Sequence, residues 1–314
     1  MTISRKIIID TDPGQDDAVA ILTALASPDE LEVLAVTAVA GNVPLDLTTT
    51  NALMLVELAD RADVPVYAGC ARPMVNPLVT AEYVHGPTGL DGANLPAPSL
   101  AVGGRHAVDV IVDSLRSAGD REVTLCILGP MTNVALAMIK APDILPKICE
   151  IVFMGGGFFE GGNVTPAAEF NIYVDPHAAH VVLSSGVPLT MMPLDVTHKA
   201  LATAPRVEAF AALGTPAGDA VAGMLGFFDR YDMEKYGSAG APLHDPCVIA
   251  YLLEPDLFAG RECHVAVVTD SGPPMGMTLV DWWGVTDQEP TVMVMNDVDA
   301  DGFFSLLTER IGRL

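Results

Sequence analysis

The sequence predicts a doubly wound α/β fold, a mostly parallel sheet flanked by helices, with an appended C-terminal part of helices and strands. Short β-rich runs alternate with longer helical runs along most of the chain. The apolar runs are continuous rather than alternating, which indicates strands buried on both faces. No Gly/Ser linker or charge run divides the 314 residues, so we expect one domain over 1–314.

The first two thirds of the chain alternate strands and helices. The run KIIIDTD at 6–12 has three consecutive isoleucines and predicts a buried strand, and DDAVAILTALA at 16–26 predicts the helix that follows. The same reasoning predicts five further strands, at 31–40, 64–68, 123–128, 150–154 and 187–194. It predicts four further helices, at 45–61, 105–118, 132–140 and 175–185.

The rhythm changes after Thr197, and this stretch is the predicted appended part. Two helical segments come first, and a third helix runs from the His-Asp-Pro sequence at 244–246 to 253. Three strands and a last helix complete the chain. We place the first two helices at about 207–212 and 218–234, the strands at 264–269, 277–282 and 291–296, and the last helix at 300–311.

The composition excludes several partners. With 40 acidic and 16 basic residues the formal charge is −24, which disfavours nucleic acid and anionic membranes. The five cysteines form no close pair, so neither a disulfide framework nor a zinc site is expected. The apolar run after Arg5 and Lys6 is too short for a signal peptide, and no run is long enough to span a membrane. We therefore expect a cytoplasmic protein.

Four carboxylates crowd the end of the first predicted strand. Asp10, Asp12, Asp16 and Asp17 lie within eight residues, where the strand ends and a helix begins. The helix dipole favours Asp16 and Asp17 by about 0.3–1 kcal/mol each, but it does not explain Asp10 and Asp12. Mutual repulsion between these groups calls for a cation, and all-oxygen ligands indicate a hard one, Ca²⁺ or Mg²⁺.

The ends of the other predicted strands also carry polar groups. Ligands of open α/β sheets bind at the carboxyl ends of the strands, where these groups are expected to converge. The Gly-Pro turn at 129–130 leaves carbonyl groups around Leu128 without ladder partners. The remaining groups are Asn42, the MGGG backbone from Met154, Asn163, the Glu169-Phe170-Asn171 sequence and His244-Asp245.

These residues form a recognisable set, and the chain resembles the inosine-uridine preferring nucleoside hydrolase family over nearly its whole length. The matching motifs are DTDPGQDDAVAIL at 10–22, VAGN at 39–42, HGPTGLDG at 85–92, LGPMTN at 128–133, MGGG at 154–157, AEFNIYVDP at 168–176 and HDP at 244–246. The resemblance implies a mostly parallel α/β fold, one tightly held Ca²⁺, and a homodimer or homotetramer. It also implies hydrolysis of ribonucleosides to ribose and free base.

The resemblance assigns a role to each matching residue. Asp12 is implied to be both a metal ligand and the general base, with Asp17, Asp245 and the Leu128 carbonyl as the other ligands. His244 lies near the leaving base, and its identity leans towards broad or pyrimidine specificity because some purine-preferring relatives carry Trp there. The remaining substrate-binding residues are implied to be Asp16, Asn42, His85, Met154, Asn163, Glu169, Phe170, Asn171, Phe227 and Tyr231, the last two without a motif to fix them.

These residue types suit cleavage of a ribosyl–base bond. The transition state is oxocarbenium-like, with positive charge on the sugar and negative charge on the departing base. A bound Ca²⁺ can hold ribose hydroxyls and a water whose lowered pKa lets Asp12 take the proton. His244 can assist the leaving base, although capping of the following helix would also explain this histidine.

Two other functions remain open at this point. A haloacid dehalogenase-type phosphohydrolase also begins with a strand that ends in Asp-x-Asp. There Asp10 would be the nucleophile and Asp12 the acid/base, with Mg²⁺ as the ion. That pattern expects Thr or Val where Gly14 stands, and it leaves Asn42 unexplained. The second alternative is a non-catalytic Ca²⁺- and ribose-binding protein that kept the pocket but lost the chemistry.

Overall fold

An eight-stranded sheet forms the centre of the molecule. The computed structural model describes residues 4–236 and 239–314, with the backbone alone for 229–236. In spatial order the strands are β3 (Val66–Ala68), β2 (Leu31–Ala38), β1 (Arg5–Thr11), β4 (Val123–Ile127), β5 (Ile148–Met154), β6 (Leu189–Met192), β12 (Val292–Val298) and β9 (Phe258–Cys263). Within the described residues, β9 alone pairs antiparallel in this sheet. The predicted fold class is confirmed.

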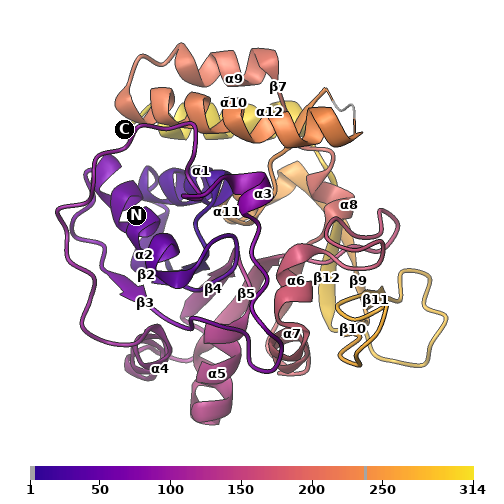
Figure 1. Cartoon of the computed structure of the whole chain (residues 1–314). Helices are drawn as coiled ribbons and strands as arrows, with labels where there is room; N and C mark the ends of the chain where they lie inside the picture. Colours follow the sequence, from indigo (N-terminus) through magenta and orange to yellow (C-terminus); the bar gives the residue numbers. More distant parts are fainter. Residues whose placement is uncertain (1–3, 237–238) are drawn as a thin grey trace.

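Helices cover both faces of the sheet, as β1 shows. Ile7 and Ile9 belong to one hydrophobic cluster and Ile8 to the other, because successive strand side chains point to opposite faces. Each fully buried isoleucine contributes about 1.5–3 kcal/mol. The first cluster includes α1 (Gln15–Leu25), α2 (Leu45–Leu58), α9 (Ala204–Ala211), α10 (Pro216–Tyr236), α11 (Pro246–Leu253) and α12 (Ala300–Ile311) (Figure 1). The second includes α4 (Ala107–Ser117), α5 (Thr132–Lys140) and α7 (Pro176–Leu183).

The C-terminal part contributes to the central sheet as well as to a smaller one. The strand expected at 291–296 is β12, which pairs parallel with β6. The strands expected at 264–269 and 277–282 are the small pair β10 (Val265–Val267) and β11 (Thr278–Val280). The sequence prediction missed β9, since only its two end residues are buried and the exposed residues between them carry no apolar signal. It also missed the short pair β7 (Leu201–Thr203) and β8 (Gly240–Pro242).

Short helices follow several strands and shape the edge where the strands end. The helix expected at 175–185 begins at Pro176, with Asp175 as its N-cap, whose side chain accepts from the Ala178 N–H at 3.0 Å. The other short pieces are α3 (Glu82–His85), α6 (Phe170–Val174), α8 (Leu194–Thr197), and the 3₁₀ turns η1 (Pro142–Lys147) and η2 (Pro255–Leu257). Among the described residues, no helix has the length and apolar character needed to cross a membrane.

Candidate active site

The acidic turn between β1 and α1 is held by hydrogen bonds to Asp17. Its Oδ2 accepts from the backbone N–H of Gly14 at 2.9 Å and from the Asn42 amide at 3.1 Å. Its Oδ1 accepts from the Thr11 hydroxyl at 2.5 Å. Asp17 therefore closes the first turn of α1 and also joins that turn to the loop after β2.

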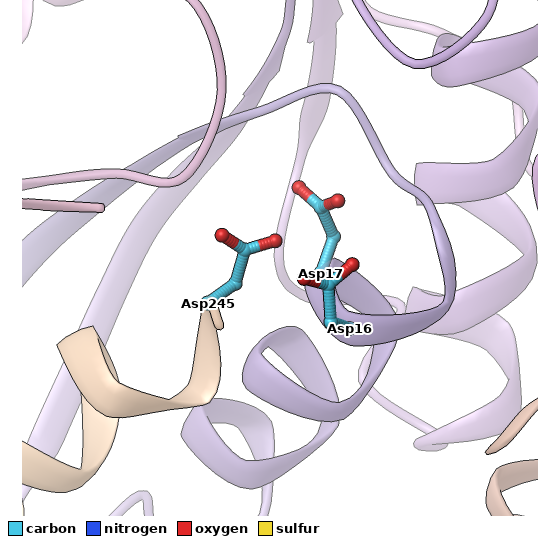
Figure 2. Close-up of side chains that lie close together, drawn as sticks. All are labelled: Asp16, Asp17 and Asp245. Carbon is cyan, nitrogen blue, oxygen red and sulfur yellow. The ribbon is translucent and has the colours of Figure 1, made fainter. Parts of the chain in front are cut away.

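Three carboxylates from two helices meet at this point. Asp16 and Asp17 lie in the first turn of α1, and Asp245 directly precedes α11. Each offers an oxygen within 4.8 Å of the others, and all three residues are buried. Figure 2 shows the Asp245 carboxylate facing the first turn of α1. The chain thus brings Asp245 to the acidic turn from more than two hundred residues away, as the sequence predicted.

The electrostatics of this cluster fit a hard cation. Burial and, second, repulsion from the neighbouring Asp17 raise the pKa of Asp16 to about 7. Burial, followed by repulsion from Asp16, Asp17 and Asp12, raises the pKa of Asp245 well above its usual value. Buried oxygens Asp12 Oδ1 and Asp16 Oδ1 have no hydrogen-bond partner. An oxygen-binding cation would satisfy these atoms and offset the repulsion.

Asp12 lies beside this trio rather than within it. Its Oδ2 accepts from the Asn42 N–H at 2.7 Å, which turns the carboxylate towards the loop after β2. A side chain at position 129 would put its Cβ 2.1 Å from Asp12 Oδ1, so Gly129 leaves the space that this oxygen occupies. The sequence predicted Asp12 as a metal ligand and Asp16 as a ribose-binding residue. In the structure, Asp16 belongs to the carboxylate trio and Asp12 does not.

Asp10 is buried below the site and serves the sheet. Its Oδ1 accepts from the Thr37 hydroxyl at 2.6 Å and from the Asn133 amide at 2.8 Å. Burial raises its pKa to about 7. Asp10 is thus tied to the residues around the strand ends, and it belongs neither to the carboxylate trio nor to the lining of the pocket described below. This placement disfavours the phosphohydrolase alternative, which needs Asp10 as the nucleophile.

Amide and carboxylate side chains hold the rim at the ends of β4 and β5. The Asn171 amide donates to the Leu128 carbonyl at 2.7 Å, which leaves a second lone pair on that carbonyl. Glu169 caps α6 and accepts from the N–H groups of Asn171 at 2.8 Å and Gly156 at 2.9 Å. Asn163 accepts from the Phe170 N–H at 3.0 Å. The rim is therefore ordered before any ligand binds.

A pocket opens above the trio. Most of the predicted site residues line it, whereas Asp12 and Asp17 are fully buried beneath. The predicted residues in the lining are Asp16, Asn42, His85, Leu128, Met154, Asn163, Glu169, Phe170, Asn171, His244 and Asp245. Most of the residues that line this pocket were therefore among those predicted from the sequence.

His244 lies in the pocket next to the trio. Its Nδ1 is 2.7 Å from the Thr197 hydroxyl. Burial and, second, the nearby His198 lower the pKa of His244 to about 3. The imidazole is therefore neutral near pH 7, so that it can donate a hydrogen bond but does not carry a full charge.

The structure differs from the sequence prediction along α10. Phe228 lines the pocket and Phe227 does not. Among the described side chains of this helix, the buried hydrophobic positions are Ala217, Ala220, Val221, Met224, Leu225 and Phe228, a spacing of three and four residues that identifies the inward face. The side chain of Tyr231, the other residue predicted here, lies outside the described part of the chain.

His198 is the second lining residue that the sequence prediction missed. It directly follows α8, and its ring centroid lies 5.9 Å from that of His244. Its Nδ1 is 3.1 Å from Glu160 Oε2. The sequence could have indicated His198, because it follows the carboxyl end of β6. The other rim residues were predicted from the same kind of position. The other unpredicted lining residues are Ala81, Tyr83, Val84 and Pro242.

Comparison with known sequences identifies one protein family. The model of the inosine-uridine preferring nucleoside hydrolase family matches residues 7–305. The pyrimidine-specific ribonucleoside hydrolase RihA of Salmonella typhimurium is 49% identical over 310 residues, which cover 98% of this chain and 99% of that protein. An uncharacterised protein of Schizosaccharomyces pombe is 51% identical over 309 residues, with 98% and 99% covered.

Solved structures agree with these relatives. A plant nucleoside hydrolase superposes with a TM-score of 0.92 at 34% identity, covering 98% of this chain and 99% of that one. A purine-preferring ribonucleoside hydrolase from Gardnerella vaginalis superposes with a TM-score of 0.91 at 33% identity, covering 98% of both chains. The chain therefore belongs to the inosine-uridine preferring nucleoside hydrolase family, and it is an N-glycosyl hydrolase.

Proposed function

We propose that this enzyme hydrolyses the N-glycosidic bond of ribonucleosides to ribose and free base, with pyrimidine ribonucleosides as the preferred substrates. The observation that carries this proposal is the meeting of Asp16, Asp17 and Asp245 beneath a pocket rimmed by amide and carboxylate groups. The base preference is supported by the higher identity to the pyrimidine-specific relative than to the purine-preferring one, 49% against 33%. The family resemblance also implies that the chain forms a homodimer or homotetramer. Light scattering would test this oligomeric state.

The metal in this proposal is one Ca²⁺, held by Asp12, Asp17, Asp245 and the Leu128 carbonyl. Asp16 lines the pocket beside them and is proposed to bind the ribose hydroxyls. The all-oxygen donor set and the unpartnered buried carboxylate oxygens support this choice of ion. When bound, Ca²⁺ neutralises the clustered carboxylates, orients ribose hydroxyls and a water, and lowers the pKa of that water.

Asp12 is proposed as the general base. Its Oδ2 is fixed by the Asn42 N–H at 2.7 Å, while the buried Oδ1 has no hydrogen-bond partner and is the oxygen left for the ion and its water. One oxygen therefore orients the carboxylate and the other does the chemistry. Proton transfer by a group positioned in this way contributes about 10²–10⁴-fold to a rate.

The rim residues are proposed to bind ribose. Asn42, Asn163, Glu169 and Asn171 are already hydrogen-bonded to backbone groups, so they are held in place before the nucleoside arrives. Such preorganisation reduces the entropy lost on binding and favours a reactive geometry. Met154 and Phe170 supply apolar contact within the same pocket.

His244 is proposed to assist departure of the base. As a neutral imidazole it donates a hydrogen bond to the negative charge that develops on the base.

Two other functions make different predictions. A phosphohydrolase would release phosphate from phosphomonoesters, and a non-catalytic binding protein would bind nucleosides without releasing base.

Assays with several substrates separate these functions. Uridine, cytidine, inosine, adenosine and guanosine are incubated with the Ca²⁺-loaded enzyme, and free base is measured beside phosphate release from a set of phosphomonoesters. We expect base release, fastest from uridine or cytidine, and no phosphate. Phosphate release, or nucleoside binding without free base, would contradict the proposal.

A further inference from the structure

A buried glutamine contacts one ring nitrogen of His85. Gln15 is the first residue of α1 and is fully buried. Its amide nitrogen donates to the backbone carbonyls of His85 at 2.9 Å and Asp91 at 3.2 Å. Its Oε1 lies 2.7 Å from His85 Nδ1. The whole side chain thus joins the start of α1 to the end of α3 and to the segment that follows it.

These contacts decide which way the amide points. If the amide were turned over, Oε1 would face two carbonyl oxygens, and three buried acceptors would share no proton. Oε1 therefore faces His85, and because it can only accept, His85 Nδ1 must carry the proton. Burial lowers the pKa of His85 to about 3, so the neutral ring has one proton near pH 7 and Nε2 has a lone pair.

The His85 ring is also held on its other sides. It stacks on Phe228 with ring centroids 5.5 Å apart. It packs so closely on Gly14 that a Cβ there would lie 2.4 Å from Nδ1. Since His85 lines the pocket and its Nδ1 edge is turned to Gln15, Nε2 is the polar edge left for a ligand.

We propose that Gln15 is a positioning residue that holds His85 as its Nδ1–H tautomer, so that Nε2 accepts a hydrogen bond from an N–H or O–H group of the bound nucleoside. The proposal rests on the nucleoside substrate proposed above. It gives His85 a specificity role, because a ligand without a donor at this position leaves the Nε2 lone pair unmatched.

His244 provides an internal contrast. Its Nδ1 faces the Thr197 hydroxyl at 2.7 Å, and a hydroxyl can either donate or accept. Thr197 therefore does not fix the His244 tautomer, whereas the Gln15 amide fixes that of His85. The pocket thus contains one histidine committed to accepting and one able to donate.

The tautomer can be measured directly by ¹⁵N NMR of histidine-labelled protein. The chain has seven histidines, and the His85 signals are identified as those lost in His85→Asn. We expect the wild-type signals to show a protonated Nδ1 and a bare Nε2, and Gln15→Met to add the other tautomer. A proton on Nε2 of wild-type His85 would overturn the proposal. This measurement needs no turnover, so it stands even if nucleoside hydrolysis is not found.

Asn51 offers a matched control. Its buried amide donates to the carbonyls of Pro13 at 3.0 Å and Thr88 at 2.9 Å, so it ties the same segment to the same turn without contacting His85. Asn51→Leu should therefore leave the His85 tautomer unchanged. A mixed tautomer in Asn51→Leu would show that loosening of the segment, rather than the Gln15 contact, controls the ring, and would contradict the proposal.

Kinetics test the specificity role. Gln15→Met should raise the KM for uridine by about 2- to 10-fold, the size of one neutral hydrogen bond, with little change in kcat. The ratio of the variant's KM to the wild-type KM is also measured with 3-methyluridine and 5′-deoxyuridine, each of which lacks one hydrogen-bond donor of uridine. We expect one of these analogues to show no KM difference between the variant and the wild type. An equal KM ratio for all three substrates would overturn the proposal.

Discussion

Two parts of the pocket are built in different ways. The carboxylate floor consists of Asp12, Asp16, Asp17 and Asp245, and three of its four members come from one turn between β1 and α1. The ring wall consists of four rings from four separate segments, namely His85 of α3, His198 after α8, Phe228 of α10 and His244 before α11.

The two parts are also stabilised differently. The floor is fixed by hydrogen bonds to backbone and side chains of neighbouring strand ends, as at Asp12 and Asp17. In the ring wall each histidine has one side-chain hydrogen-bond partner, and the rings also contact one another, His85 and Phe228 at 5.5 Å and His198 and His244 at 5.9 Å. We infer that the floor sets the chemistry and that the ring wall, which can change one segment at a time, sets the choice of base.

The largest effect should come from the floor. Asp12→Asn keeps an oxygen for the Asn42 N–H but removes the base, so kcat should fall by about 10²–10⁴-fold. Steady-state kinetics with uridine measure this, and circular dichroism checks that the fold survives. A kcat close to that of the wild type would remove Asp12 from its assigned role.

The next effect should distinguish the ring wall from the floor. His244→Ala should lower kcat/KM for uridine by about 10- to 100-fold, but that for an activated nitrophenyl riboside much less, because nitrophenolate leaves without assistance. The control is His198→Ala, which removes the neighbouring ring and should affect both substrates alike. Equal losses on both substrates in His244→Ala would exclude its role at the leaving base.

The floor should also make the metal-free protein sensitive to pH. The pKa of Asp16 is raised to about 7 and the pKa of Asp245 well above its usual value, by burial first and by neighbouring carboxylates second. The folded state thus keeps protons that the unfolded chain loses at about pH 4, so the free energy of unfolding falls as the pH rises through about 7.

Asp245→Asn removes one of the interacting charges and should reduce this pH-dependent loss by about 1–2 kcal/mol. In chelator, the difference in Tm between about pH 5 and about pH 8 should therefore shrink by about 2–4 °C relative to the wild type. Differential scanning calorimetry measures both proteins. An unchanged pH dependence in the variant would show that the floor carboxylates do not repel one another in the folded state.

The smallest effect should come from one ring of α10. Phe228→Leu should raise the KM for uridine by a few fold, because the ring that stacks on His85 is replaced by a smaller side chain. Phe227→Leu is the matched control, one residue away and outside the pocket lining, and should leave KM unchanged. The reverse order of the two effects would place the substrate against the other face of α10.

The sequence predicted the floor better than the ring wall for a physical reason. Parallel strands bring their carboxyl ends to one edge, so the residues after β1, β2 and β4 meet there whatever the lengths of the helices between them. Asn42, Leu128 and the acidic turn could be placed by this rule alone. Asp245 opens a helix outside the strand pattern, and its role as a metal ligand was expected from the family resemblance.

The ring wall depends on helix rotation, which a strand pattern does not fix. The prediction of Phe227 was one residue away from the lining residue Phe228, and one residue turns a helical side chain by about 100°. The spacing of Val221, Met224 and Leu225 identifies the face of the helix that points inward, and Phe228 lies on that face. β9 was missed for a related reason, since an exposed edge strand has little apolar pattern.

Calcium binding to the floor tests the account most directly. Ca²⁺ is titrated into chelator-stripped protein in a calorimeter, and the titration is repeated with Asp245→Asn. The account predicts one Ca²⁺ per chain in the wild type, since one cluster of three carboxylates was found among the described residues, and much weaker binding in the variant. No binding to the wild type, or equal binding to both proteins, would contradict it.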